Sequence, residues 1–165
     1  RQLMRYPILV DTNVPLTANG KADHADDLCQ VSCIEKLIDI QANGRVLVDS
    51  TGFIFLEYSR NLSHKGQPWL GDVFFKWLWD NQGHENLCTR VPILKEDEEG
   101  CEFAEFPNDP DLMGFDRSDR KFVATAIASG ENPPIINATD MDWRDFRLAL
   151  VKHEVRIEFI CPHLM

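Results

Sequence analysis

The sequence predicts a single α/β domain with a mostly parallel central sheet flanked by helices. Short apolar runs at residues 7–10, 46–48, 135–137 and 155–160 are bounded by turn residues, which indicates strands, and helical patterns separate them. Strands that alternate with helices favour parallel pairing with right-handed crossovers. The chain has 165 residues, 44% hydrophobic and 27% charged, an ordinary composition for one globular core. We therefore expect one domain, residues 1–165.

The first connection in this scheme is a helix over residues 24–44. Aliphatic side chains recur in it at helical spacing, which predicts the face that packs on the sheet, and Gly44 provides a C-terminal stop. The second strand, residues 46–48, follows directly. The side chains expected to be buried in this helix are Leu28, Val31, Ile34, Leu37 and Ile38.

Two helices are expected between the second strand and the third. The first covers residues 51–62, and the second covers residues 68–82 and begins at Pro68, because proline suits the first turn of a helix. Residues 88–94 predict the third strand, which Pro92 restricts to a sheet edge or a strand end. The expected core side chains of the second helix are Trp69, Phe74, Trp77 and Leu78.

The last third of the chain continues the alternation. A helix over residues 118–130 is expected to have Ser118 as its cap, and residues 142–153 predict another helix after the strand at 135–137. In the closing strand, residues 155–160, apolar and polar side chains alternate. The apolar face of the first of these helices is predicted to comprise Phe122, Val123, Ala126 and Ile127.

One acidic segment carries most of the excess negative charge. The net charge is −10, and residues 96–111 contain eight acids and no base, so without them the net charge would be −2. The segment also contains Phe103 and Phe106, which is typical of a mobile loop or of an element that docks a partner. We interpret residues 95–116 as an acidic insertion, and a solvated loop without a role is the plainer alternative.

The five cysteines are an odd number and lack the spacing of a zinc ribbon or a disulfide framework, so we expect buried structural thiols. No apolar run approaches the ~18 residues that cross a bilayer, and the N-terminal residues lack the apolar stretch of a signal peptide. We therefore expect a cytoplasmic protein without a membrane partner. Because a methionine stands at position 4, residues 1–3 are interpreted as a tag remnant.

Five acids from distant parts of the chain are expected to meet at one edge of the sheet. Asp11 ends the first strand, and Glu57 lies in the helix after the second. Asp119 lies in the first turn of a later helix, and Asp140 and Asp142 follow the strand after it. In a parallel sheet these positions gather at the edge where ligands bind. Gathered carboxylates raise one another's pKa unless a cation neutralises them, which favours a hard divalent cation with oxygen ligands.

Each of these acids also has a purely structural alternative. Asp11 could form an Asx-turn, Asp119 could compensate a helix dipole, and Glu57 could lie on a solvated face. Asp140 and Asp142 could cap the helix that follows them. A shared metal site is the interpretation that accounts for all five positions together.

Taken in order, four motifs of the chain resemble the PIN domain family. They are the strand ending in VDTN at residues 10–13, the helical Glu57, the Asp-x-x-x-Val-Ala-x-Ala pattern that begins at Asp119, and the Thr-Asp-x-Asp-Trp pattern that begins at Thr139. The PIN family comprises metal-dependent ribonucleases, including many toxins of bacterial toxin/antitoxin pairs. The resemblance implies a three-layer PIN-like fold across nearly the whole chain.

The resemblance also assigns roles by position. Asp11, Glu57, Asp119 and Asp140 match the family's four acids, which implies that they bind metal and carry catalysis. Asp142 matches an additional acid of the closing motif and is expected to join the metal site.

Two further polar residues match the family, and three features depart from it. Asn13 matches the polar residue two positions after the first acid, and Thr139 matches the hydroxyl residue before the fourth. Asp116 is a competing carboxylate three residues before the third acid, residues 95–116 form an insertion, and the chain is long for a minimal toxin. These departures bear on toxin identity more than on fold.

The activity that the resemblance implies is hydrolysis of phosphodiester bonds in single-stranded RNA, assisted by Mg²⁺ or Mn²⁺. Basic residues on either side of the site are expected to contact phosphates of the nucleic acid. An antitoxin, another protein partner or a homodimer would be consistent with the family. The expected nucleic-acid-binding residues are Arg60, Lys65, Arg117, Arg120 and Lys121.

Three other functions fit parts of the pattern. A haloacid-dehalogenase-like phosphatase needs a second acid two residues after the first, where Asn13 stands, and a response-regulator receiver domain needs an acidic pair where only Asp11 is present. The third is a PIN-fold binding or scaffold protein without turnover. Such a protein would act through its acidic insertion, residues 95–116, as a partner surface.

Overall fold

The computed structural model describes residues 4–165, so the expected tag remnant at residues 1–3 lies outside the described residues. The strands are β1 (Tyr6–Val10), β2 (Gly44–Asp49), β3 (Cys88–Val91), β4 (Pro134–Asn137) and β5 (Arg156–Phe159). They form one sheet in the order β3-β2-β1-β4-β5, and every strand is parallel to its neighbours. The predicted α/β architecture with a parallel sheet is confirmed, and β3 lies at an edge as Pro92 indicates.

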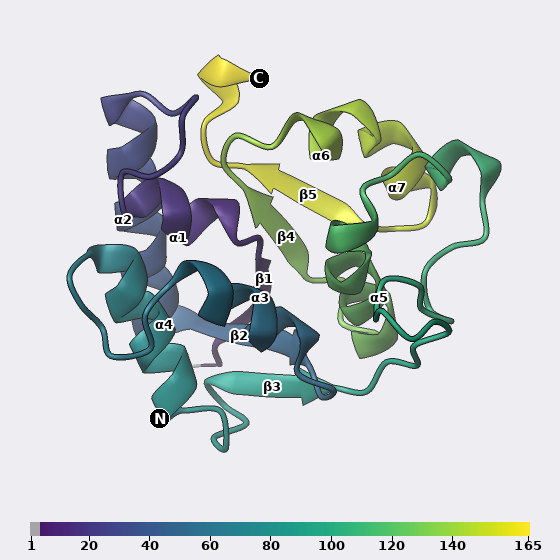
Figure 1. Cartoon of the computed structure of the whole chain (residues 1–165), viewed down its shortest axis with the longest axis horizontal. Coiled ribbons are helices and arrows are strands. Elements are labelled where there is room, and N and C mark those ends of the chain that lie inside the picture. Colours follow the sequence, from purple (N-terminus) through teal and green to yellow (C-terminus); the bar gives the residue numbers. More distant parts are fainter. Residues whose placement is uncertain (1–3) are drawn as a thin grey trace.

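Helices cover both sides of this sheet (Figure 1). They are α1 (Asn13–Ala18), α2 (Asp27–Asn43), α3 (Phe53–Asn61), α4 (Leu70–Asp80), α5 (Arg120–Ser129), α6 (Met141–Asp145) and α7 (Arg147–Lys152). Short 3₁₀ helices cover Pro110–Leu112, Arg117–Asp119 and Pro162–Leu164. On one side, α1, α2 and α4 pack against one another; on the other, α5 packs against β2, β3 and β4, and α7 packs against β5. No helix in residues 4–165 is long and apolar enough to span a membrane.

The central strand β1 is buried on both faces, which explains its uninterrupted aliphatic sequence. Ile8, Leu9 and Val10 are each at most 1% exposed. Leu9 pairs with Ile135 of β4, so the two strands run side by side to the same edge of the sheet. The chain therefore leaves β1 at that edge with Asp11 as its next residue.

Helix α2 buries only part of the face that was predicted. Leu37 is 1% exposed as expected, and Ile34 packs partly buried against the core. Leu28, Val31 and Ile38, which the aliphatic spacing placed in the core, are 61%, 49% and 56% exposed. The competing stripe on the same helix contains two cysteines, which a count of aliphatic residues overlooks, and it is this stripe that packs inward. The buried side chains of α2 are Cys29, Cys33, Leu37 and Ile40.

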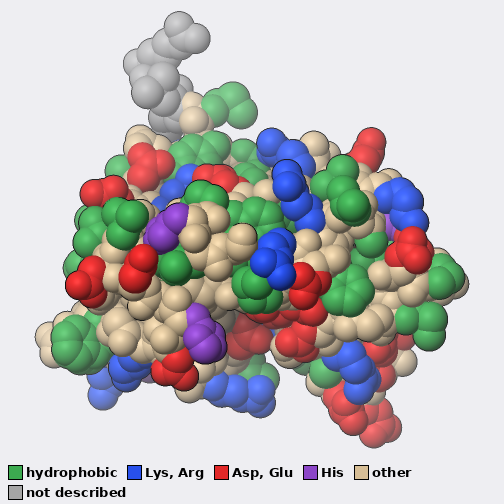
Figure 2. Space-filling view, turned by 90° about the horizontal axis from the view of Figure 1, so that it is seen from above, with side chains coloured by type: hydrophobic (Ala, Val, Ile, Leu, Met, Phe, Trp, Pro, Cys, Tyr) green, Lys and Arg blue, Asp and Glu red, His purple; other side chains and the backbone are tan. Residues whose placement is uncertain are grey.

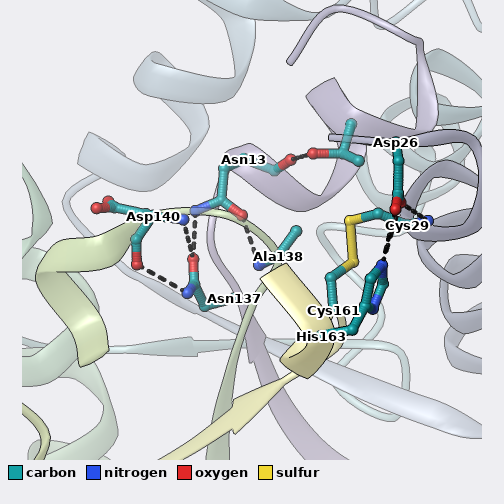
Figure 3. The surroundings of a disulfide bond; sticks show 9 residues. Asn13, Asp26, Cys29, Asn137, Ala138, Asp140, Cys161 and His163 are labelled. Atoms are coloured by element: carbon teal, nitrogen blue, oxygen red, sulfur yellow. Dashed lines mark hydrogen bonds and ion pairs between the residues drawn. A yellow bond between two sulfur atoms is a disulfide. The ribbon is translucent and has the colours of Figure 1, made fainter. Parts of the chain in front are cut away.

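The expectation that all the cysteines are free thiols is wrong for two of them. Cys29 at the start of α2 forms a disulfide with Cys161, just after β5, across a sequence separation of 132 residues (Figure 3). Asp26 caps α2 by accepting a hydrogen bond from the backbone N of Cys29 at 2.8 Å, and His163 lies 3.0 Å from the same carboxylate. The disulfide and this contact attach the last residues to α2. Among the described residues, the free thiols are Cys33, Cys88 and Cys101.

Helix α4 begins at Leu70 rather than at Pro68. The Asp72 carboxylate accepts a hydrogen bond from the backbone N of Trp69 at 3.1 Å, and this contact sets the first turn two residues later than the proline pattern predicts. Trp69 was expected in the core and is 49% exposed instead, because it precedes the helix.

Two more local expectations need correction. The helix predicted over residues 142–153 is divided into α6 and α7, which meet at Phe146, where the backbone leaves helical geometry. In α5, Ile127 was expected on the buried face and is 36% exposed, whereas Phe122 and Val123 are fully buried.

A candidate metal site at the carboxyl edge of the sheet

Three of the predicted acids come together where β1 and β4 end. Asp11 directly follows β1, Asp140 lies three residues after β4, and Asp119 ends the 3₁₀ turn that leads into α5. One carboxylate oxygen from each lies within 4.8 Å of the others. Because β1 and β4 are neighbours in the sheet, the topology brings residues 11 and 140 to one place, and the start of α5, the helix that leads into β4, adds residue 119.

Asp11 is held by two side-chain donors. The indole Nε1 of Trp143 donates to its Oδ2 at 3.3 Å, and the Asn13 amide nitrogen donates to the same oxygen. The Asn13 amide is itself fixed to the end of β4, because its nitrogen donates to Oδ1 of Asn137 at 2.6 Å and its oxygen accepts from the backbone N of Ala138 at 2.8 Å (Figure 3). Asn13 therefore orients the carboxylate rather than offering a free ligand.

Asn137, the last residue of β4, holds the loop that carries Asp140. Its amide nitrogen donates to the carbonyl oxygen of Asp140 at 3.0 Å, and its amide oxygen accepts from the backbone N of Asp140 at 3.2 Å (Figure 3). Asp140 also caps α6, since its Oδ1 accepts from the backbone N of Asp142 at 3.0 Å. Thr139 lies half-buried beside it. The sequence reasoning missed Asn137, although a polar residue at the end of the apolar run IIN is a visible signal.

Asp119 is the most isolated of the three acids. It is 5% exposed, and its Oδ2 has no hydrogen-bond partner within residues 4–165. A buried charged oxygen without a partner is costly, and an unpaired one in a native site points to an ion or another ligand.

The turn before Asp119 is capped by Asp116 and not by Ser118. The Asp116 carboxylate accepts hydrogen bonds from the backbone N and the hydroxyl of Ser118, both at 2.9 Å. The backbone N of Asp116 in turn donates to Asp142 Oδ2 at 2.8 Å. Asp116 and Asp142 thus brace the turn that presents Asp119, and neither contributes an oxygen to the group of three.

Burial and mutual repulsion shift the pKa of these carboxyls upward. For Asp119, burial and then the charges of Asp11 and Asp140 raise the pKa to about 10. For Asp11, burial and then the charges of Glu57 and Asp140 raise the pKa well above its usual range. Burial also raises the pKa of Asp142. Without a cation, burial and repulsion therefore disfavour the charged forms of these two carboxyls.

Glu57 lies beside this group, but its two oxygens are already bound. Its Oε1 accepts from the ammonium of Lys121 at 2.8 Å, and its Oε2 accepts from the hydroxyl of Thr12. The structure therefore brings Asp11, Asp119 and Asp140 together as predicted and places Glu57 with a lysine, outside the three-oxygen group.

Two of the basic residues expected to bind phosphate point into the protein. Arg120 is 8% exposed and donates to the carbonyl oxygens of Met113 at 2.9 Å and Phe115 at 3.1 Å and to Glu102 at 3.0 Å. Lys121 is also buried. These inward contacts overturn the expectation that Arg120 and Lys121 line a nucleic-acid surface.

The other basic residues expected to bind phosphate are exposed, but one of them forms ion pairs with two acids of the insertion. Arg117 lies 3.2 Å from Asp97 and 3.0 Å from Glu102. Arg60 and Lys65 are exposed on and after α3. On the face seen in Figure 2, Lys and Arg side chains are interspersed with Asp and Glu side chains rather than gathered in one patch.

The acidic insertion is anchored to the fold next to this site. Phe103 is 3% exposed and packs with Ile93 and Ala124 of α5, and the guanidinium of Arg120 lies 4.7 Å from the centre of the Phe106 ring. These two aromatic side chains attach the segment to α5, and its acids pair with Arg117 and Arg120 at the start of that helix.

Comparison with known proteins gives no relative for this chain. No protein-family model, no curated protein and no solved structure matches it. The resemblance to PIN domains therefore stays a prediction from the motifs.

Proposed function

We propose that this chain is a divalent-metal-dependent nuclease of PIN type that hydrolyses phosphodiester bonds, with single-stranded RNA as substrate. The observation that carries the proposal is the buried Oδ2 of Asp119, which has no hydrogen-bond partner in the described part of the chain and lies beside the carboxylates of Asp11 and Asp140. Three carboxylates that converge at the carboxyl edge of a parallel sheet provide the oxygen ligands that hard cations prefer.

The donor set fits Mg²⁺ or Mn²⁺, and Asp11, Asp119 and Asp140 would hold the ion. The chemistry that a bound ion would supply there is polarisation of a phosphoryl oxygen and a lowered pKa of a water, so that no protein side chain would have to be the nucleophile. Mg²⁺ keeps several waters, so three protein carboxylates are sufficient.

The chain's own residues position this donor set. Trp143 and Asn13 hold Asp11 in one orientation, and Asn137 fixes the backbone of Asp140. Asp142 supports the site indirectly, through the backbone of Asp116. Rigid support of this kind keeps the metal ligands arranged before the substrate binds, and such preorganisation is a large contribution to catalysis.

Recognition of RNA would rest on few basic side chains of the protein. Arg60 and Lys65 remain accessible, whereas Arg117 is paired with acids of the insertion. This pairing favours the second candidate, a PIN-fold binding or scaffold protein without turnover that acts through residues 95–116. An antitoxin or another protein partner would then engage that segment.

The test is Mn²⁺-dependent cleavage of single-stranded RNA and DNA oligonucleotides by the wild type, Asp11→Asn and Asp119→Asn. We expect cleavage of RNA by the wild type and its loss in both variants, with the exposed Asp23→Asn as a control that keeps activity. Circular dichroism checks that each variant is folded. A folded wild type that binds Mn²⁺ and cleaves neither substrate would favour the scaffold function, and cleavage that survives in both variants would refute the acid site.

A further inference from the structure

A buried lysine lies in the midst of the candidate site. Lys121 is in the first turn of α5, two residues after Asp119, and its side chain is 9% exposed. Its ammonium donates to Glu57 Oε1 at 2.8 Å and also to the carbonyl oxygen of Ser118. Lysine is almost never this buried unless it is paired, so the contact with Glu57 is a requirement of the fold around it.

We propose that the ammonium of Lys121 is a built-in cation that occupies Glu57, so that the site binds one divalent ion and not two. The inference rests on the proposed metal-dependent function and adds to it the number of ions and the role of Lys121. In this arrangement Asp11, Asp119 and Asp140 hold the single ion, and Lys121 is a positioning residue that withholds Glu57 from the ion.

The contacts of Glu57 support this assignment. Both of its oxygens are engaged, one by Lys121 and the other by the hydroxyl of Thr12, whereas Asp119 keeps an oxygen free among the described residues. The two sets of groups therefore differ in what they still need. Within residues 4–165 none of the three aspartates forms an ion pair, whereas Glu57 is paired with Lys121.

Charge gives a second reason. In two-metal sites the ions lie about 3.5–4 Å apart and need carboxylates of their own or shared between them. The Lys121 ammonium already lies 2.8 Å from Glu57 Oε1. A second divalent ion bound to Glu57 would therefore lie against a like charge, and like charges repel strongly in a buried site. Removing the ammonium would leave the Thr12 hydroxyl as the partner of Glu57 among residues 4–165, so its charge would no longer be neutralised beside the three aspartates, which is the arrangement a second ion needs.

The experiment measures how many Mn²⁺ ions bind per chain, by isothermal titration calorimetry and by the electron paramagnetic resonance of bound Mn²⁺. The proteins are the wild type, Lys121→Met, the double variant Lys121→Met/Glu57→Gln, and the exposed Lys65→Met as a matched control. We expect one ion for the wild type, two magnetically coupled ions for Lys121→Met, and one again for the double variant and the control.

The outcomes separate this inference from the proposed function. A folded wild type that binds no Mn²⁺ refutes the metal site and the inference with it. A wild type that binds two ions, or a folded Lys121→Met that still binds one, refutes only the role of Lys121.

The single variant Glu57→Gln keeps the inference testable even if Lys121→Met does not fold. If Lys121 withholds Glu57 from the ion, Glu57→Gln should change the dissociation constant of the single ion by less than about tenfold. Loss of the ion in that variant would mean that Glu57 is a ligand, which overturns the inference.

Discussion

Replacing Asp119 by asparagine should stabilise the protein in the absence of divalent metal. Burial and neighbouring charges raise the pKa of Asp119 to about 10, so the folded protein holds a proton that the unfolded chain releases near its ordinary pKa of 3.8. The stability that this group contributes is therefore fully present below pH 3.8 and is lost progressively as the pH rises toward 10. Asparagine has the shape of the protonated acid and no proton to lose.

The size of the effect follows from the linkage between protonation and folding. Each pH unit between the two pKa values is worth about 1.4 kcal/mol, so an isolated group would lose about 4 kcal/mol between pH 5 and pH 8. Asp140 is half-exposed, so water reaches the group and relieves part of the penalty, and Asp11 competes for the same proton. We therefore expect a smaller gain for the variant at pH 8, about 1–2 kcal/mol, or about 3–8 °C in Tm for a chain of this size.

The assay is urea denaturation at pH 5, 6.5 and 8 in the presence of EDTA, for the wild type, Asp119→Asn and the exposed control Asp23→Asn. The difference between Asp119→Asn and the wild type should grow with pH, and Mn²⁺ should stabilise the wild type but not the variant. The reasoning would be refuted if the difference in free energy of unfolding between the variant and the wild type were the same at all three pH values. It would also be refuted if the wild type became more stable relative to the variant as the pH rises.

Three other substitutions test the supporting structure. Cys161→Ser should lower the free energy of unfolding by about 4 kcal/mol because the lost disulfide closes a long loop, and a thiol reductant should lower the Tm of the wild type but not of the variant. Asp49→Ala should cost about 1–2 kcal/mol in urea denaturation without changing Mn²⁺ affinity, because Asp49 accepts from the first backbone N–H groups of α3 at 2.8 Å. Trp143→Phe should cost about 1 kcal/mol and weaken Mn²⁺ binding measured by calorimetry, because Asp11 loses its indole donor at 3.3 Å.

The strands could be predicted because their signal is local. In β1, β2 and β4 a run of buried aliphatic residues is enough to indicate a strand, and the order of strands and helices predicts parallel pairing. The meeting of Asp11 with Asp140 follows from the same reasoning, since both stand just beyond strand ends that become neighbours.

The same local pattern occurs twice with different outcomes. The chain contains ILVDT at residues 8–12 and VLVDS at residues 46–50, and both place an aspartate at the end of a buried strand. Asp11 joins the acid group, whereas Asp49 turns to the backbone of Phe53 and Ile54 and caps α3. A helix follows both strands, but α1 begins two residues after Asp11 whereas α3 begins four residues after Asp49, where its first backbone N–H groups donate to the Asp49 carboxylate.

What the sequence could not predict depends on partners far away in the chain. The pairing of Cys29 with Cys161 and the ion pair of Lys121 with Glu57 join residues whose proximity is decided by the assembled fold. Arg120 is of the residue type expected to bind phosphate beside the site. Its inward orientation depends on Glu102 and on carbonyl groups of the preceding loop. Charge patterns alone do not carry that information.

The disulfide between Cys29 and Cys161 has a mechanical consequence. It converts residues 29–161 into a covalent ring, so a force applied between residues 4 and 165 stretches only the two segments outside the ring. Those segments extend to roughly 11 nm, compared with about 57 nm for the reduced chain over the same residues. Under tension the ring shields Glu57, Asp119 and Asp140, and β1 with Asp11 is the part of the sheet that bears the load.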